Sequence, residues 1–162
     1  MKVKQKTQHP LALALENNIE ETVMINSRKT EDLLPQVAVL CEQFIAECKK
    51  ADIDVIITST YRDKESQDAL YAQGRTKAGT KVTNARGGQS FHQYRIAFDF
   101  CPIVSGKADW TNVISFQKCG KIAESLGLEW AGRWVTFKEL AHCQFTGGLT
   151  LADLEAGKRP FA

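Results

Sequence analysis

Apolar side chains recur at helical spacing in the segment that follows Thr30. Thr30 is a candidate N-cap, Glu31 and Asp32 would occupy the first turn, and the pattern continues to about Lys50. The apolar positions are Leu33, Val37, Leu40, Cys41, Phe44, Ile45 and Cys48. This spacing predicts an amphipathic helix that buries one face.

A second segment with the same periodicity covers residues 112–126. Thr111 is its candidate N-cap, and Gly127 follows its last turn. Near the end of the chain, Thr150 and Asp153 have the spacing of a capping box, which predicts a short terminal helix.

Shorter elements lie between these helices. Residues 53–58 form a β-branched run that predicts a buried strand, and residues 63–73 predict a helix closed by Gly74. Residues 75–90 are polar and glycine-containing without periodicity, as is typical of a functional loop. Because helices and short strands do not alternate as βαβ units, we expect an α+β fold with a small antiparallel sheet and flanking helices.

The composition is that of one ordinary globular domain. The chain has 162 residues, of which 43% are hydrophobic and 25% charged. We expect an N-terminal extension over residues 1–25 and a single domain over residues 26–162. The net charge of +2 is too balanced to indicate nucleic acid as a partner.

Five cysteines without a CxxC pair predict buried free thiols of a protein made in a reducing compartment. The apolar run Leu11–Leu15 is broken by Glu16 before it reaches the length of a signal peptide, so we expect neither a signal peptide nor membrane insertion. The sequence therefore predicts synthesis in the cytoplasm.

Two histidines lie near acidic residues at spacings that suggest a metal site. A catalytic zinc takes three protein ligands and keeps one open position, and His92, Asp99 and His142 would supply that set, leaving Glu139 as a base. Taken singly, a buried histidine is more often a hydrogen-bonded core residue. Glu139 and His142 share a face only across a turn, and the odd spacing of His92 and Asp99 requires a bend or bulge between them.

Three blocks of sequence resemble one family. The segment SFHQYRIAFD (residues 90–99) resembles the SxHxxGxAxD signature of zinc peptidases that include D-Ala-D-Ala carboxypeptidases, VanX- and VanY-like enzymes and phage L-alanyl-D-glutamate endolysins. Residues 127–134 (GLEWAGRW), with Phe137, Glu139, His142 and Gln144, are similar to a second block, and STYR (residues 59–62) to a third. The resemblance implies a hedgehog/DD-peptidase-like fold.

The chain departs from the family pattern at three positions. Arg95 stands where the family has glycine, Ala131 replaces the first glycine of WGG, and Arg133 replaces a common acidic residue. If position 95 needs a positive φ, arginine there costs on the order of 1 kcal/mol. None of the three changes removes a ligand or the base.

The resemblance also implies roles for individual residues. Zinc would be held by His92, Asp99 and His142, and would lower the pKa of a bound water toward roughly 7, with Glu139 as general base. Arg62 would stabilise the oxyanion, its alternative being a surface salt bridge. The candidates for substrate binding are Ser90, Gln67, Trp130 and Trp134. For the tryptophans a core position is an equal alternative, and for Ser90 a hydroxyl satisfied by the backbone.

These roles predict a monomeric zinc metallopeptidase that hydrolyses L-Ala–D-Glu in the stem peptides of bacterial peptidoglycan, as an endolysin does. A D-Ala-D-Ala carboxypeptidase or dipeptidase is the alternative within the class, favoured if the pocket ends in a cation. A non-catalytic zinc-binding interaction domain is the alternative outside it, and Glu139 counts against that one. Without a signal peptide, such an enzyme would reach the cell wall through a separate holin-like protein.

Overall fold

A small antiparallel sheet organises the fold. The computed structural model describes residues 24–161, so the predicted extension over residues 1–25 lies almost wholly outside the described residues. The strands follow the order β1-β2-β5-β4, with β3 paired to β2, and every pair is antiparallel. The strands are β1 (Asp54–Ser59), β2 (Ala97–Val104), β3 (Lys107–Ala108), β4 (Glu129–Trp130) and β5 (His142–Gln144). The predicted α+β fold is confirmed.

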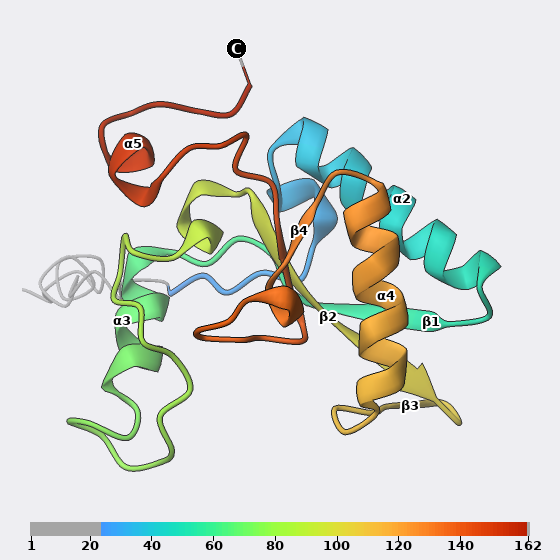
Figure 1. The fold of residues 1–162 in the computed structure, drawn as a ribbon. Helices are drawn as coiled ribbons and strands as arrows, with labels where there is room; N and C mark the ends of the chain where they lie inside the picture. The colour runs from blue at the N-terminus through green and yellow to red at the C-terminus, as the bar shows by residue number, and fades with distance from the viewer. Residues whose placement is uncertain (1–23, 162) are drawn as a thin grey trace, which may run out of the picture.

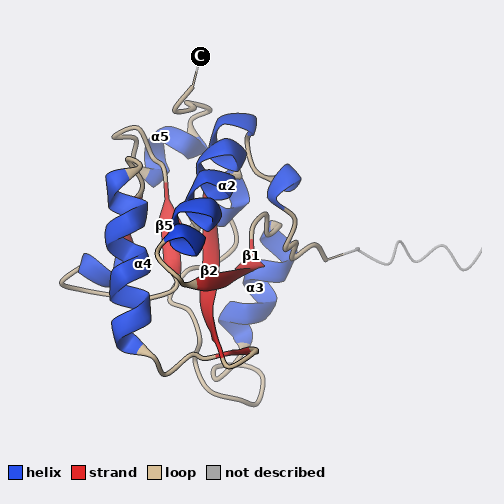
Figure 2. Cartoon of the chain, turned by 90° about the vertical axis from the view of Figure 1, so that its right-hand side faces the viewer, coloured by secondary structure: helices blue, strands red, loops and turns tan. Residues whose placement is uncertain are grey.

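Helices cover the sheet from two sides. On one face lie α2 (Pro35–Lys50) and α4 (Val113–Ser125), as Figures 1 and 2 show. On the other side are α3 (Lys64–Ala72), α5 (Leu151–Glu155) and the long segment over residues 75–90. Three short 3-10 helices complete the described chain: η1 (Thr30–Asp32), η2 (Phe91–Tyr94) and η3 (Ala131–Arg133). No helix among the described residues has the length and apolar character to cross a membrane.

The core lies between β2 and the pair α2 and α4. Phe44 packs against Phe98 and Phe100 with ring centroids 5.5 and 4.9 Å apart, and Phe100 packs against Phe116 at 5.5 Å. All five cysteines are buried and free, as the sequence predicted. One face of the sheet is therefore committed to packing, and polar groups are left to the other.

The first long helix begins later than its pattern predicted. Thr30 is not its N-cap: Thr30–Asp32 form a 3-10 turn, and α2 starts at Pro35. Proline fits the first helical position but pushes the residue before it out of the helical region, and Leu34 accordingly has φ −54° and ψ 142°. The boundary is set by Pro35.

The cap of α4 was also misplaced by one residue. Asn112, not Thr111, accepts the hydrogen bond from the backbone N–H of Ser115, at 3.0 Å. The Thr111 hydroxyl instead donates to Asp109 at 2.7 Å, so it is already used in the preceding turn. The predicted capping box of α5 is confirmed.

Trp130 is clamped in the core at the edge of the sheet. Its ring fills the space beside Gly120 of α4 and Gly132 of η3 so closely that a Cβ at either glycine would overlap the ring. Its indole N–H donates to the carbonyl of Leu140 at 2.8 Å. Trp130 thus ties α4 to the segment that leads into β5.

Arg95, which stands where the resembled pattern has glycine, adopts the left-handed conformation. Its φ is 61° and its ψ 29°, and it ends η2 so that the chain can turn into β2. The side chain offsets part of the strain, because its guanidinium donates to the Asp32 carbonyl at 2.8 Å and lies 3.8 Å above the Tyr61 ring. Arginine is tolerated here through contacts that glycine could not make.

Two substitutions at this position separate the strain from the contacts. Arg95→Ala and Arg95→Gly both lose the guanidinium, but only alanine keeps a Cβ in the left-handed region. We expect the glycine variant to be the more stable by about 1 kcal/mol, measured by urea denaturation. Equal stability of the two variants would contradict a strained backbone at position 95.

Candidate metal centre

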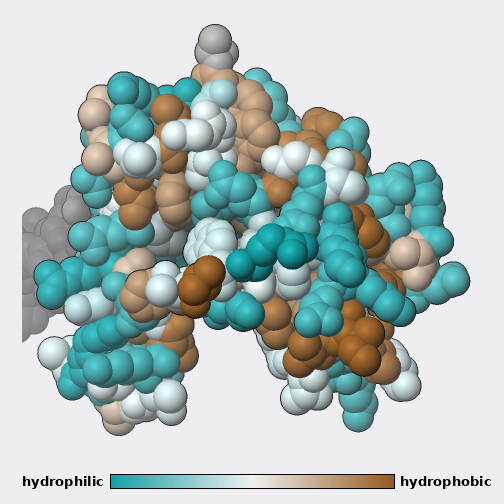
Figure 3. Space-filling view, viewed as in Figure 1, coloured by the Kyte–Doolittle hydropathy of each residue, from teal (hydrophilic) through white to brown (hydrophobic). Residues whose placement is uncertain are grey.

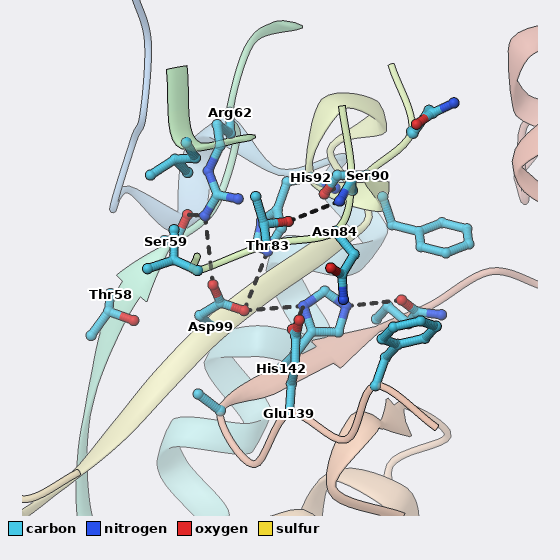
Figure 4. A pocket seen from close by; sticks show the side chains of 18 of the residues that line it. Thr58, Ser59, Arg62, Thr83, Asn84, Ser90, His92, Asp99, Glu139 and His142 are labelled. Atoms are coloured by element: carbon cyan, nitrogen blue, oxygen red, sulfur yellow. Dashed lines mark hydrogen bonds and ion pairs between the residues drawn. The ribbon is translucent and has the colours of Figure 1, made fainter. Parts of the chain in front are cut away.

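Three metal-ligating side chains converge on the polar face of the sheet. Asp99 of β2 and His142 of β5 face each other across a strand pair, and His92 comes from η2. His92 Nε2 and His142 Nδ1 lie 3.2 and 3.1 Å from the same Asp99 oxygen, Oδ1. The three donor atoms lie within 4.8 Å of one another, and Figure 4 shows the side chains pointing together. The structure brings together the three ligands that the sequence predicted.

The backbone places these ligands as their spacing required. The turn at Arg95 lies between His92 and Asp99, which confirms the predicted bend. Glu139 and His142 are separated by the predicted turn, in which the backbone N–H of His142 donates to the Glu139 carbonyl at 3.3 Å. Strand β5 begins directly at His142.

Hydrogen bonds on the far side of each imidazole fix which nitrogen is unprotonated. His92 Nδ1 lies 2.7 Å from the Thr60 carbonyl, which can only accept, so Nδ1 carries the hydrogen. His142 Nε2 lies 2.9 Å from Oε1 of Gln144 and carries the hydrogen for the same reason. The lone pairs of His92 Nε2 and His142 Nδ1 therefore face the Asp99 carboxylate. Two neutral imidazoles and a carboxylate fit a divalent metal ion.

Asp99 is ionised, as a ligand must be. Burial works against its ionisation, but when the two imidazoles are protonated, the charge of His92 and the hydrogen bonds of both rings outweigh burial and hold the pKa of this carboxyl well below its usual range. A metal ion would take the place of those protons on the neutral rings. The side chain is 22% exposed, so it also faces the groove described below.

Arg62 is a buried cation beside this cluster. Its Nη2 lies 3.7 Å from Asp99 Oδ2 and donates to the Ser59 hydroxyl at 3.0 Å. A register shift near the end of β1 sets Ser59 opposite Asp99. Burial lowers the pKa of the guanidinium, although arginine stays protonated in proteins. With only 11% of its side chain exposed, Arg62 is not the surface salt bridge that the sequence left open.

Gln67 supports Arg62 and does not line the groove. It is fully buried, its Oε1 accepts from Arg62 Nη1 at 3.0 Å, and its Nε2 donates to the Ala85 carbonyl at 2.8 Å. The prediction that Gln67 binds substrate was therefore wrong: its amide orients the arginine.

Glu139 stands at the edge of the cluster rather than inside it. Its Oε2 lies 3.9 Å from His142 Nδ1, and 55% of its side chain is exposed. A carboxylate in this position is within reach of a water beside the three ligands while remaining open to solvent. This geometry suits a base better than a fourth ligand.

A groove of about 1110 Å³ passes over these residues. Figure 3 shows this face, hollowed between the part built by α3 with the segment after it and the part built by α4. Ser90 and Trp134, which the sequence suggested as substrate contacts, line the groove, and Phe137 adds an exposed aromatic ring. The Ser90 hydroxyl also accepts from the backbone N–H of His92 at 3.3 Å.

Trp130 lies elsewhere. Only 6% exposed and clamped in the core, it does not line the groove, so the structure corrects its assignment to substrate binding.

Two groups that orient the histidines were missed from the sequence. The carbonyl of Thr60 was missed as the acceptor for His92, because a backbone carbonyl leaves no trace in the residue type. Gln144 belonged to the recognised block, but its bond to His142 could not be inferred before the strand register was known.

Comparison with known proteins agrees with this geometry. A family model described as VanY, D-alanyl-D-alanine carboxypeptidase, matches residues 30–138. The chain is 39% identical to the peptidoglycan L-alanyl-D-glutamate endopeptidase CwlK of Bacillus subtilis (strain 168), in a match that covers 70% of this chain and 73% of that protein.

Two solved structures share the fold. The L-Ala D-Glu endopeptidase ChiX of Serratia marcescens matches with a TM-score of 0.57 and 18% identity, over 81% of this chain and 95% of that one. A variant of the vancomycin-resistance D,D-pentapeptidase VanY, in complex with Zn(II), matches with a TM-score of 0.56 and 16% identity, over 82% and 90%.

The cluster predicts one divalent metal ion per chain. Because a three-ligand site loses affinity by orders of magnitude when one ligand is removed, His142→Ala should be isolated without metal after dialysis against metal-free buffer. Metal content is measured by plasma mass spectrometry, with His9→Ala as the control, since His9 is the third histidine of the chain. Full metal occupancy in His142→Ala would contradict the site.

Proposed function

Because the chain belongs to the VanY family of D-alanyl-D-alanine carboxypeptidases, we propose that it is a zinc-dependent peptidase that hydrolyses an amide bond in the stem peptides of bacterial peptidoglycan. One observation carries the proposal. A metal-ligating triad, a solvent-accessible carboxylate and a buried guanidinium line a single groove. These are the groups that amide hydrolysis requires.

Zinc is the metal that the donor set favours. Two imidazoles with one carboxylate suit zinc, whereas magnesium and calcium prefer oxygen ligands alone. A zinc ion held by His92, Asp99 and His142 would supply a Lewis acid and lower the pKa of a water molecule toward roughly 7.

The remaining steps belong to the chain's own residues. Glu139 accepts a proton from the attacking water while the oxygen of that water forms a bond to the carbonyl carbon of the peptide. Arg62, held by Ser59 and Gln67, presents its guanidinium toward the negative charge that develops on the carbonyl oxygen. Glu139 then delivers the proton to the amide nitrogen as the carbon–nitrogen bond breaks.

We propose L-Ala–D-Glu as the bond that is cut. The similarity to the L-alanyl-D-glutamate endopeptidase CwlK supports this choice, and so does the scarcity of positive charge in the groove. A carboxypeptidase needs a cation for the terminal carboxylate of its substrate in addition to a partner for the oxyanion. Among the described residues that line the groove, Arg62 is the only lysine or arginine, and it faces the reacting centre. The groove therefore suits a bond within a longer peptide.

A non-catalytic interaction domain is the alternative of another class. Glu139 argues against it, because an exposed carboxylate beside a metal triad has no structural task to perform. The proposal also includes a monomer that acts on the cell wall after release by a holin-like protein.

Digestion of purified peptidoglycan tests the proposed function directly. The zinc-loaded protein is incubated with purified peptidoglycan, and mass spectrometry identifies the new termini. We expect new L-Ala carboxyl ends and D-Glu amino ends. Release of free D-Ala from peptidoglycan would indicate a carboxypeptidase, hydrolysis of added free D-Ala-D-Ala without cleavage of peptidoglycan would indicate a dipeptidase, and no cleavage by a zinc-loaded sample would refute the proposal.

Glu139→Gln should keep the metal and the fold but lose turnover. Glutamine occupies the same space and cannot take a proton, so hydrolysis should fall by a factor of about 10² to 10⁴. Metal analysis and the muropeptide assay are run on the same preparation. Loss of zinc would make Glu139 a ligand, and undiminished cleavage would make it a bystander.

Arg62→Ala should reduce turnover by roughly 10² or more while the metal content stays unchanged. Arg62→Lys should restore only part, because an ammonium cannot donate to Ser59, Gln67 and substrate in the same fixed plane. Steady-state kinetics on a soluble muropeptide measure both variants. Near-normal turnover in Arg62→Ala would remove the oxyanion role.

A further inference from the structure

The edge strand β4 contributes a carboxylate that reaches toward the metal centre from outside the groove. Glu129 of β4 pairs with Gln144 of β5. Its Oε2 accepts from Gln144 Nε2 at 2.9 Å, and its Oε1 accepts from the Thr146 hydroxyl at 2.6 Å. Neither bond is part of the machinery described above.

These bonds continue to a metal ligand. Gln144 is buried, and the other end of its amide, Oε1, lies 2.9 Å from His142 Nε2. Glu129, Gln144 and His142 therefore form a chain of hydrogen bonds that ends on the ring whose Nδ1 faces Asp99.

The direction of this chain is set at its outer end. An amide offers a donor at one end and an acceptor at the other, whereas an ionised carboxylate only accepts. Facing Glu129, Gln144 must turn its NH₂ group outward and its oxygen toward His142. The reversed amide would point NH₂ at His142 Nε2 and so favour the hydrogen on Nδ1, where it would block metal binding.

The two histidines differ in this respect. His92 is oriented by the carbonyl of Thr60, a backbone acceptor whose polarity cannot reverse. Only His142 is oriented by a reversible side chain, and Gln144 is held in one sense by Glu129.

We propose that Glu129 is a positioning residue for the metal centre: through Gln144 it holds His142 in the tautomer whose Nδ1 can bind the metal. The inference rests on the proposed function only in taking His142 as a metal ligand. Thr146 assists by holding the Glu129 carboxylate through its second oxygen.

Exchange of the two side chains provides a test. In Glu129→Gln, the side chain at position 129 can also donate, so it no longer excludes the reversed orientation of the Gln144 amide. Zinc affinity should then fall by about tenfold, the lower end of the range for residues that hydrogen-bond to a metal ligand. In the double variant Glu129→Gln with Gln144→Glu, the same atoms are present in reverse order, and residue 144 can only accept from His142. Most of the affinity should return.

Zinc affinity is measured by chelator competition, and nitrogen-15 NMR of the metal-free protein reports which ring nitrogen of His142 is protonated. We expect Nε2–H in the parent and the exchanged protein, and a population with Nδ1–H in Glu129→Gln. Glu124→Gln is the control, because Glu124 is an acid of α4 that is paired with Arg133 of η3 and has no bond to the site.

Unchanged affinity in Glu129→Gln would overturn the inference. A loss that the exchange does not restore would also overturn it, because charge or packing at position 129 would then explain the effect. A parent protein that binds zinc but cuts no peptidoglycan would refute the proposed function and leave this inference standing.

Discussion

The pairing of Asp99 with His142 across β2 and β5 is the constraint on which the site depends. It joins two side chains that are 43 positions apart in the chain and turns both toward the same face of the sheet. Because side chains alternate along a strand, a slip of one residue in β5 would turn His142 into the core and bring Cys143 to the groove. The turn that carries Glu139 enters β5 directly and would move with it, so one register fixes the positions of both the proposed ligand His142 and the proposed base Glu139.

Burial of the polar face of the sheet costs solvation free energy, and the burial of apolar side chains on the opposite face offsets that cost. A guanidinium, a carboxylate and two imidazoles lie close together with little contact with solvent, an arrangement that desolvation opposes. Each charged or polar group is matched by a specific partner, such as Thr60 for His92 and Gln67 for Arg62. The packed phenylalanines and thiols beneath the sheet contribute the burial that holds this polar layer in place.

The sequence predicted the class of fold and the side chains that converge in the candidate metal centre, because both leave local signals. Helical periodicity located α2 and α4, and the spacing of His92, Asp99 and His142 could be judged against what a metal needs. The starting point of α2 was missed because Pro35 outweighs the capping preference of Thr30. Gln67 and Trp130 were misassigned for another reason: their types suit a groove and a core equally, and only tertiary packing distinguishes the two.

The clamp around Trp130 restricts the order in which this sequence could have changed during evolution. A larger residue at Gly120 or Gly132 meets the indole ring, so neither glycine can change first. A smaller residue in place of Trp130 leaves a void and frees the carbonyl of Leu140, in the turn that joins Glu139 to His142. The three positions change only by simultaneous or compensated substitutions, whereas exposed residues that line the groove, such as Val82 and Phe137, can change one at a time and so alter which peptide is accepted.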